Sequence, residues 1–170
     1  MGYSLKKSDL SKTKQGTEFT YFSEEEWNCY PFVNEQDAKW FREAKYGLFL
    51  HVGISAIGMV DISWSRTTHK LPDPSCGSIV SDEEYDGWAK QIAFPNFNAK
   101  KWADLAKAGG FKYVVIIAKH HDGFHMWDTA YSDYKITNAP FGRDYLKELI
   151  NAFRSAGLKI GVYYSKRDWT

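Results

Sequence analysis

Three apolar runs of strand length stand out along the chain, and polar residues follow each of them. The runs are Tyr46–Val52 (YGLFLHV), Lys112–Ala118 (KYVVIIA) and Lys159–Tyr164 (KIGVYY). The middle run is unbroken and rich in β-branched residues, a pattern typical of a strand covered on both faces in a parallel sheet. We therefore expect three strands of one parallel sheet.

Between these runs, three segments carry apolar residues at helical spacing behind a polar residue that can cap a helix. The first opens at Ser81, where Glu84 three residues later completes a capping-box pattern, and extends to about Ile92. The expected apolar faces of the other two helices are Trp102, Leu105 and Ala106 behind Asn98, and Leu146, Leu149, Ile150 and Phe153 behind Asp144. Gly109–Gly110 and Gly157 are expected to end them.

The remaining segments lack such patterns. Residues 1–36 are expected to form an irregular arm, and residues 37–170 a folded domain whose first helical stretch opens at Asp37. Residues 53–80 are rich in Gly, Pro, Ser and Asp and predict a long loop. Loops of that length in a compact domain are usually functional or disordered.

One helix–glycine–strand pattern occurs twice, as AGGFKYVVIIAKHHD from Ala108 and as SAGLKIGVYYSKRDW from Ser155. This repetition favours alternating α/β architecture with a parallel sheet, either a barrel or a doubly wound sheet. Polar residues gather where the strands end, at His51, Lys119–Asp122 and Ser165–Asp168. Ligands bind at this edge in both architectures, whereas the absence of a glycine-rich phosphate loop disfavours a nucleotide.

Composition narrows the function classes. The charge is +1, from 22 Lys and Arg against 21 Asp and Glu without a basic stripe, so we expect no nucleic-acid partner. Aromatic residues make up 17% of the chain, and their faces can stack on sugars or fill a Tyr-rich core. No apolar run reaches the length of a membrane span, and residues 1–20 lack the apolar centre of a signal peptide, so we expect no membrane partner and leave the compartment open. Cys29 and Cys76 predict neither a disulfide framework nor a metal cluster.

The histidines at the predicted strand ends are the main candidates for chemistry. His120, His121 and Asp122 follow the second run in KHHDGF, and Gly123 allows the turn that would bring both imidazoles to one pocket. Neutral imidazoles there can donate to and accept from substrate hydroxyls. The alternative is one core histidine beside one exposed histidine. His51 ends the first run in the same manner, and it is either a structural or a binding residue.

Other chemistries have weaker signals. His and Asp at strand ends also occur in metal-dependent barrel hydrolases, but the chain has no HxH or HExxH spacing. A serine nucleophile is disfavoured because no G-x-S-x-G elbow is present and Ser165 has no base partner in sequence. Cleavage of a glycosidic bond requires two carboxyl groups. Spacing singles out no such pair among the available aspartates, which are Asp122, Asp128, Asp133, Asp144 and Asp168.

Aromatic and basic side chains near the strand ends leave further alternatives open. Trp64 is either a sugar platform or the anchor of its loop, and Arg66 either pairs with a carboxylate or is solvated. Tyr163 and Tyr164 end the third run, and the pleat requires that one faces inward and the other outward.

Three blocks that occur in order resemble the α-L-fucosidase family of glycoside hydrolases. They are KYGLFLHVG, FKYVVIIAKHHDGFHMWDTAYSDY and APFGRDYLKELINAFRSAGLKIGVYYS, and the resemblance covers residues 38–170. WSR at 64–66 and TNAPFGRD at 137–144 are similar to the bacterial branch. The resemblance implies an α/β fold, the N-terminal portion of a (β/α)8 TIM-type barrel that is incomplete in this chain. It also implies a retaining hydrolase that releases terminal α-L-fucose from a fucosylated glycan, without a cofactor or metal.

The resemblance also implies roles for individual residues. Those expected to contact the fucose are His51, His120, His121, Tyr163 and Trp64. Asp122 is expected to support the histidines and the loop. The nucleophile and the acid/base are expected beyond Thr170, so no catalytic residue is expected within the chain and the chain alone is expected to be inactive. Val52 stands where the family usually has Trp, which removes a packing surface beside His51.

Length agrees with a partial barrel, since a complete one takes about 250 residues and eight strands. Three alternatives stay open: a non-catalytic carbohydrate-binding remnant of the barrel, a metal-dependent barrel hydrolase, and a truncated product with no independent function. The sequence predicts no oligomeric state.

Overall fold

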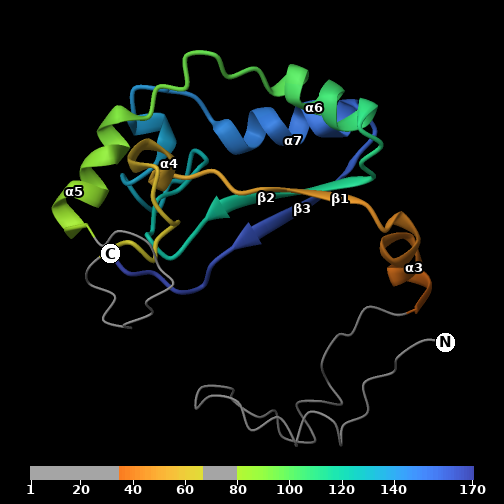
Figure 1. Ribbon diagram of the computed structural model, residues 1–170, viewed down its shortest axis with the longest axis horizontal. Coiled ribbons are helices and arrows are strands. Elements are labelled where there is room, and N and C mark those ends of the chain that lie inside the picture. Colours follow the sequence, from red (N-terminus) through yellow and green to blue (C-terminus); the bar gives the residue numbers. More distant parts are fainter. Residues whose placement is uncertain (1–34, 67–79) are drawn as a thin grey trace, which may run out of the picture. The chain divides into compact units, whose positions relative to one another are not determined.

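The computed structural model describes residues 35–66 and 80–170 (Figure 1). The chain divides into two compact units, Met1–Lys39 and Trp40–Thr170. Most of the expected arm and both cysteines lie outside the described residues. Helix α3 (Glu35–Ala44) begins at Glu35 rather than at the expected Asp37. None of the helices in the described ranges is long and apolar enough to cross a bilayer.

Three parallel strands form the sheet, in the order β1-β2-β3. They are β1 (Gly47–Leu50), β2 (Tyr113–Lys119) and β3 (Lys159–Tyr164). The register pairs Gly47 with Tyr113, and Tyr113 with Lys159. The predicted parallel sheet is therefore confirmed, and its three carboxyl ends meet at one edge (Figure 1).

Two amphipathic helices cover one face of this sheet (Figure 1). They are α6 (Ala99–Ala108) and α7 (Tyr145–Ser155). The predicted caps are confirmed, because the side chain of Asn98 accepts the Lys101 N–H at 2.9 Å and that of Asp144 accepts the Lys147 N–H at 2.8 Å. Gly157 follows α7 with φ +86°, a conformation that glycine adopts without the strain of a side chain.

The apolar face predicted for α7 is confirmed, but the one predicted for α6 is partly wrong. Leu105 is 73% exposed, whereas Ala103 and Ala106 are buried in the core cluster. The stripe formed by these alanines packs into the core, chiefly beside α7, and it is rotated away from Leu105. The core residues that lie between the sheet and these helices include Val114, Ile116, Leu149 and Phe153.

The segment between β1 and α6 is more structured than predicted. The expected loop 53–80 contains the short helix α4 (Ser55–Gly58), and residues 67–79 of it lie outside the described residues. The capping box at Ser81 is confirmed, since Ser81 Oγ accepts the Glu84 N–H at 3.2 Å. The helix that follows is α5 (Asp82–Gly87), which tightens into the 3-10 helix η1 (Trp88–Gln91) instead of running on to Ile92. Such tightening is frequent at helix ends.

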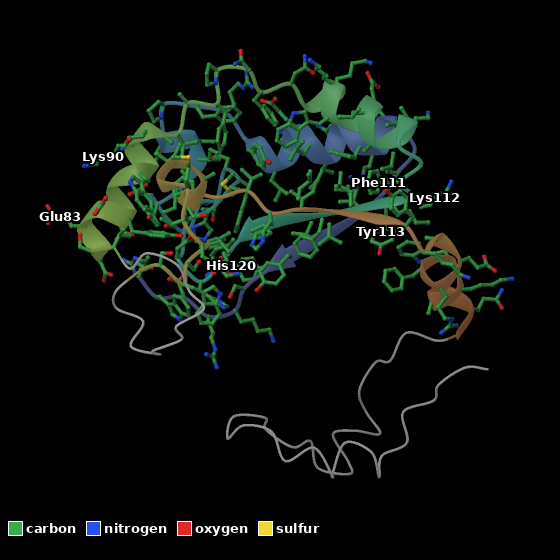
Figure 2. All side chains as sticks on the ribbon, viewed as in Figure 1. Glu83, Lys90, Phe111, Lys112, Tyr113 and His120 are labelled. Carbon is green, nitrogen blue, oxygen red and sulfur yellow. The ribbon has the colours of Figure 1, made fainter. Side chains whose placement is uncertain are left out.

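The other face of the sheet carries aromatic side chains, and helix α3 packs against it at the amino end of β2 (Figure 2). Tyr113 packs against Phe41, with ring centroids 5.3 Å apart, and Phe49 lies 6.2 Å from Tyr163. Phe49 is 54% exposed. Beyond β2 the chain turns back through a further 3-10 helix, η2 (Ile136–Asn138), before it reaches α7.

Candidate functional site

The five residues predicted to form a site lie together at the carboxyl edge of the sheet. His51 follows β1, His120 and His121 follow β2, Tyr163 belongs to β3, and Trp64 lies in the loop after β1. The His120 ring is 5.6 Å from His51, 5.5 Å from Tyr163 and 4.4 Å from His121, measured between centroids. Trp64 meets His121 edge to face at 5.5 Å. These residues form one continuous cluster, which we call the histidine cluster.

Exposure and charge within the histidine cluster suit hydrogen bonding to a neutral ligand. His51 is exposed, whereas His120 is only 7% exposed. Burial, with the positive potential of His121, His51 and Lys119, lowers the pKa of His120 to about 4. Burial also lowers the pKa of His51, against an opposing effect of Asp61. Both rings are therefore neutral at neutral pH, and a neutral imidazole offers one donor and one acceptor.

A buried ring of hydrogen bonds, which we call the Ser63 circuit, lies beneath His120. Ser63 Oγ contacts His120 Nδ1 at 2.6 Å and accepts the backbone N–H of Asp122 at 3.0 Å. The Ser63 N–H donates to Tyr85 Oη at 2.7 Å, and Tyr85 Oη donates to Asp122 Oδ2 at 2.9 Å. All four residues are at most 7% exposed. The circuit therefore fixes His120 from the side away from solvent.

Asp122 lies in the wall of the site and does not face the histidine cluster. It is 2% exposed, and its Oδ1 accepts the Phe124 N–H at 3.1 Å. Burial raises its pKa, although hydrogen bonds from Phe124, Tyr85 and Ser63 oppose the shift. This geometry suits the supporting role implied by the resemblance, which stays a prediction.

The turn after the two histidines depends on Gly123, as the sequence suggested. Gly123 has φ +74° and donates its N–H to the His120 carbonyl at 3.2 Å. A Cβ at this position would also lie 2.7 Å from the Thr170 side chain and 2.8 Å from an Asp168 oxygen. Both the backbone conformation and the space therefore require glycine here.

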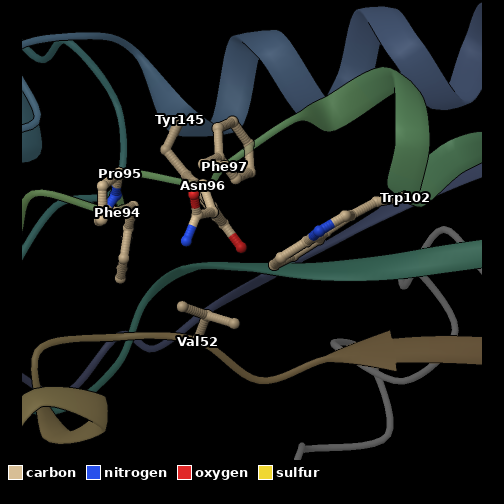
Figure 3. Close-up of a pocket in the computed structure, with 7 residues that line it drawn as sticks. All are labelled: Val52, Phe94, Pro95, Asn96, Phe97, Trp102 and Tyr145. Atoms are coloured by element: carbon tan, nitrogen blue, oxygen red, sulfur yellow. The ribbon is translucent and has the colours of Figure 1, made fainter.

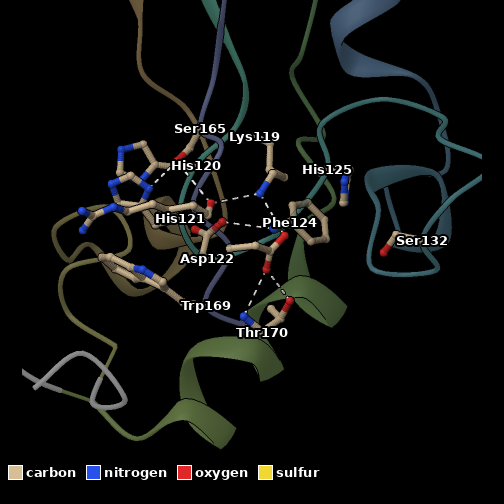
Figure 4. A network of polar contacts seen from close by, with 12 residues as sticks. Lys119, His120, His121, Asp122, Phe124, His125, Ser132, Ser165, Trp169 and Thr170 are labelled. Carbon is tan, nitrogen blue, oxygen red and sulfur yellow. Dashed lines mark hydrogen bonds and ion pairs between the residues drawn. The ribbon is translucent and has the colours of Figure 1, made fainter. Parts of the chain in front are cut away.

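A second set of contacts holds His121 (Figure 4). Its Nδ1 lies in hydrogen-bond contact with Ser165 Oγ, and Ser165 Oγ is 3.2 Å from the Arg167 carbonyl oxygen. The Trp169 ring packs on His121 at 4.5 Å, and the Trp169 N–H donates to the His121 carbonyl at 2.8 Å. Ser165 thus has a histidine partner that its sequence neighbours did not reveal.

Two ion pairs anchor the segment that carries Trp169. Arg66, 5% exposed, donates to both carboxylate oxygens of Asp86 at 3.0 and 2.6 Å, and to the Trp169 carbonyl at 2.6 Å. The prediction that Arg66 pairs with a carboxylate is confirmed. Lys119, 2% exposed, donates to Asp168 at 2.9 Å. Sequence patterns placed Lys119 at a strand end but gave it no partner, and they did not single out Asp86, because neither pairing has a local signal.

Tyr163 and Tyr164 face opposite sides, as the pleat requires. Tyr163 stacks near His120, whereas Tyr164 is 54% exposed and lies under Lys119 Nζ at 5.3 Å. Asp144 is confirmed as a helix cap, and Asp128 pairs with Lys135 at 2.8 Å.

Val52 lies on the opposite side from His51, next to a pocket of about 350 Å³ beneath α6 and α7 (Figure 3). The residues that line the pocket are Val52, Phe94, Pro95, Asn96, Phe97, Trp102 and Tyr145. The Tyr145 hydroxyl points into it and has no hydrogen-bond partner among the described residues. The space beside Val52 therefore lies on the helix-covered side, and a looser wall at His51 stays a prediction.

The metal-dependent alternative gains no support from this geometry. Within residues 35–66 and 80–170, no group of three or more His, Cys, Asp and Glu side chains is arranged to hold a metal ion. The Nδ1 atoms of His120 and His121 face serine hydroxyls, and Asp122 accepts from Tyr85 and Phe124.

Comparison with known proteins gives one consistent result. The family model described as Alpha-L-fucosidase matches residues 14–170. The chain is 33% identical to the plasma alpha-L-fucosidase of Homo sapiens over 138 residues and 34% identical to the tissue alpha-L-fucosidase of Rattus norvegicus over 139 residues. These alignments cover 76% and 77% of this chain but only 30% of either relative, so the chain spans about a third of the length of the curated relatives it matches.

Solved structures agree with this assignment. Alpha-L-fucosidase isoenzyme 1 from Paenibacillus thiaminolyticus is 41% identical with a TM-score of 0.68, over 79% of this chain and 30% of that one. A trapped covalent intermediate of an α-L-fucosidase from Bacteroides thetaiotaomicron is 32% identical with a TM-score of 0.68, over 81% of this chain and 31% of that one. The chain therefore belongs to the α-L-fucosidase family of glycosidases.

Proposed function

We propose that this chain supplies the fucose-binding part of a retaining glycoside hydrolase that releases terminal α-L-fucose from fucosylated glycans. The observation that carries the proposal is the histidine cluster at the carboxyl edge of a parallel sheet. Neutral imidazoles can hydrogen-bond sugar hydroxyls, and the faces of Tyr163 and Trp64 can pack on the C–H surface of a sugar ring. The Bacteroides relative was trapped as a covalent intermediate with 2-fluoro-fucosyl fluoride, which supports a retaining mechanism by analogy.

The fold supports the interpretation that residues 37–170 are the first part of a (β/α)8 barrel. The three strands are parallel and in chain order, and α6 and α7, which precede β2 and β3, cover one face. The other face carries the aromatic side chains and the histidines, as the interior and mouth of a barrel would. This arrangement accounts for a site built from several strand ends.

We place the catalytic nucleophile and acid/base outside residues 1–170, so that this chain alone is inactive. Two described carboxylates near the cluster are already engaged, since Asp122 is buried beneath His120 and Asp168 pairs with Lys119. A third, the exposed Asp61 near His51, accepts the N–H of Ile62. A purified 170-residue chain that cleaved an aryl α-L-fucoside above the level of its His121→Ala variant would contradict this placement.

The test of the binding site uses the full-length protein. His120→Ala and His121→Ala each remove a hydroxyl contact that contributes about 1–3 kcal/mol, so kcat/KM on an aryl α-L-fucoside should fall roughly ten- to hundredfold. His125→Ala is the matched control, since His125 lies in the same loop and contacts the Tyr134 carbonyl instead of the cluster. If both variants retain the kcat/KM of the wild type with the fold intact by circular dichroism, the proposed role of these histidines is wrong.

A non-catalytic carbohydrate-binding protein is the second candidate. It is favoured by the same engagement of Asp122 and Asp168, since sugar binding needs no carboxyl pair. Fucose at millimolar concentration would then perturb tryptophan fluorescence, because Trp64 and Trp169 border His121. Turnover by the full-length protein excludes this alternative.

A further inference from the structure

A tight turn in the loop after β1 has a backbone conformation that is rare in proteins. The Trp64 N–H donates to the Ile62 carbonyl at 2.6 Å, which closes a three-residue γ-turn with Ser63 at its centre. Ser63 has φ +57°. A γ-turn with a positive φ at its central residue is strained, and positive φ is itself uncommon for a residue that carries a side chain. The chain therefore adopts an unfavourable backbone conformation at Ser63.

Hydrogen bonds to several segments hold Ser63 in this conformation. Its N–H donates to Tyr85 Oη at 2.7 Å, and its carbonyl accepts the Arg66 N–H at 3.1 Å. Its hydroxyl contacts His120 Nδ1 at 2.6 Å and accepts the Asp122 N–H at 3.0 Å. Ser63 is fully buried, so these protein groups satisfy all its polar atoms. Strained conformations persist where the surrounding structure determines them in this way, and they cluster at functional sites.

Ser63 differs from the other residues that share its backbone conformation. Within residues 35–66 and 80–170, the residues other than glycine with a positive φ are Lys45, Met59, Ser63 and Phe94. Lys45 and Met59 are exposed, and Phe94 is partly exposed. Met59 ends α4 in the left-handed conformation that is common after a helix. Ser63 is thus the one among these four that is buried, and its side chain contacts the histidine cluster.

We propose that Ser63 is a positioning residue whose hydroxyl holds the His120 ring, and that the strained turn exists to place this hydroxyl. Trp64, the next residue of the turn, meets His121 edge to face at 5.5 Å. One turn therefore supports both histidines that follow β2. The inference rests on the proposed function, in which His120 contacts the sugar. Because hydrogen bonds are directional, a ring that is released from Ser63 aligns less well with a sugar hydroxyl.

Two substitutions separate the hydroxyl from the strain. Ser63→Ala removes the hydroxyl and keeps the Cβ, whereas Ser63→Gly removes the hydroxyl and also relieves the strain, because glycine adopts a positive φ freely. Both keep the backbone N–H that donates to Tyr85. In urea denaturation of the full-length protein, the ratio of folded to unfolded molecules should be about fivefold higher for Ser63→Gly than for Ser63→Ala. A ratio for Ser63→Gly no higher than that for Ser63→Ala would contradict the strained turn.

The direct measure of the contact is nuclear magnetic resonance on the full-length, ligand-free protein with ¹⁵N-labelled histidine. His120→Gln assigns the signals of His120. These signals should move in both Ser63→Ala and Ser63→Gly, because Nδ1 loses the hydroxyl that it contacts. Unchanged His120 signals in the folded variants would overturn the proposal.

Kinetics then test whether the contact matters for the reaction. In both Ser63→Ala and Ser63→Gly, kcat/KM on an aryl α-L-fucoside should fall about tenfold, and to the same extent despite their different stabilities. A loss in Ser63→Ala that is absent from Ser63→Gly would show that Ser63 acts through stability alone, and would overturn the positioning role. Since Ser63→Gly is the more stable variant, the test does not depend on the folding of Ser63→Ala.

Two matched controls separate the Ser63 contact from general effects of the loop. Ser65 is also fully buried, and its hydroxyl has no hydrogen-bond partner among the described residues. Ser65→Ala should therefore leave the His120 signals and kcat/KM unchanged. Met59 is 92% exposed with φ +52°, so Met59→Gly should exceed Met59→Ala in stability by a similar factor without either effect. A movement of the His120 signals in Ser65→Ala as large as in Ser63→Ala would show that general packing of the loop holds the ring, and would overturn the proposal.

The combined measurements separate this inference from the proposed function. His120 signals that move in the Ser63 variants, with kcat/KM unchanged in these variants and in His120→Ala, would contradict the proposed function of His120 alone. Signals that move while kcat/KM falls in His120→Ala but not in the Ser63 variants would instead overturn the positioning role of Ser63.

Discussion

The two buried regions of this chain are built from different kinds of side chain. Between the sheet and helices α6 and α7, the buried residues are mainly aliphatic and aromatic. At the carboxyl edge of the same strands, buried side chains are polar or charged. Those at most 5% exposed include Ser63, Ser65, Arg66, Lys119, Asp122 and Ser165. One strand, β2, belongs to both regions and ends in the lysine that begins the polar one.

This difference indicates that the apolar core mainly sets the stability of the fold, whereas the polar edge mainly sets the positions of the side chains in the site. Apolar burial is non-directional, so the helix-covered core tolerates small shifts and holds the strands together. Buried hydrogen bonds and ion pairs are directional and are costly when broken, so the edge holds its side chains in fixed positions. The histidine cluster lies at this carboxyl edge, among the directional contacts. Substitutions in the core, at an ion pair of the edge and at an edge carboxylate should separate the two contributions.

The largest effect is expected in the apolar core. Phe153 is fully buried on α7, and Phe153→Ala should lower the free energy of unfolding by about 3–5 kcal/mol through lost burial and a cavity. Urea denaturation of the full-length protein measures the change. Arg154→Ala, at the exposed neighbouring position, is the control and should change stability by less than about 0.5 kcal/mol.

The comparison also requires that the core variant leaves the site intact. In the folded fraction of Phe153→Ala, the KM for an aryl α-L-fucoside should match that of the wild type, because Phe153 does not contact the histidine cluster. A large rise in KM with the fold retained would show that the two regions are coupled.

An intermediate effect is expected at the ion pair between the buried Arg66 and the partly exposed Asp86. Arg66→Lys keeps the charge but loses the two-pronged contact with Asp86 and the bond to the Trp169 carbonyl. Loss of these buried contacts should cost about 1–3 kcal/mol and lower kcat/KM, because Trp169 packs on His121.

Arg143→Lys is the matched control for this prediction. Arg143 also pairs with a carboxylate, Glu148 at 2.9 Å, but its side chain is 53% exposed. An exposed pair contributes less than about 1 kcal/mol, so stability and kcat/KM should barely change. Equal losses in the two variants would contradict the distinction between directional burial and surface pairing.

Much of the framework could be predicted from the sequence because its signals are local. Asn98 and Asp144 cap helices through bonds to residues three positions later, and β2 was visible as an unbroken apolar run. The face of α6 was harder to predict. Leu105 is apolar yet exposed, because the side of α6 that carries Ala103 and Ala106 is the one that packs into the core, chiefly beside α7.

The sequence predicted the histidines of the candidate site but not the residues that support them. Strand ends marked the histidines, since parallel strands bring their carboxyl ends together. Their supports could not be found, because Ser63 joins His120 across 57 residues and Tyr85 joins Asp122 across 37. Such tertiary pairs leave no spacing pattern, and the positive φ of Ser63 has no sequence signal when the residue is not glycine.

The smallest expected effect is a difference in how stability depends on pH. Burial alone would raise the pKa of Asp168, but hydrogen bonds from Thr170 and Lys119 lower it to about 2, below its ordinary value of 3.8. A lowered pKa in the folded state stabilises the protein above the unfolded value, and this contribution is lost as pH falls from 3.8 toward about 2. Asp168→Asn should therefore flatten the acid limb of the stability profile. The flattening should be under about 1 kcal/mol, because the side chain is 41% exposed and screened by solvent.

A core variant shows whether this pH dependence belongs to the edge. Ile116→Val removes one buried methylene from β2, the strand that carries Lys119, and should lower stability by about 0.5–1.5 kcal/mol at every pH, without altering the shape of the profile. Thr170→Val removes one donor to Asp168 and should flatten the acid limb in part. Ile116→Val could instead flatten the acid limb of the stability profile as much as Asp168→Asn does. The acid sensitivity would then arise from global unfolding, and the claim that charge-dependent contacts at the carboxyl edge cause it would be wrong.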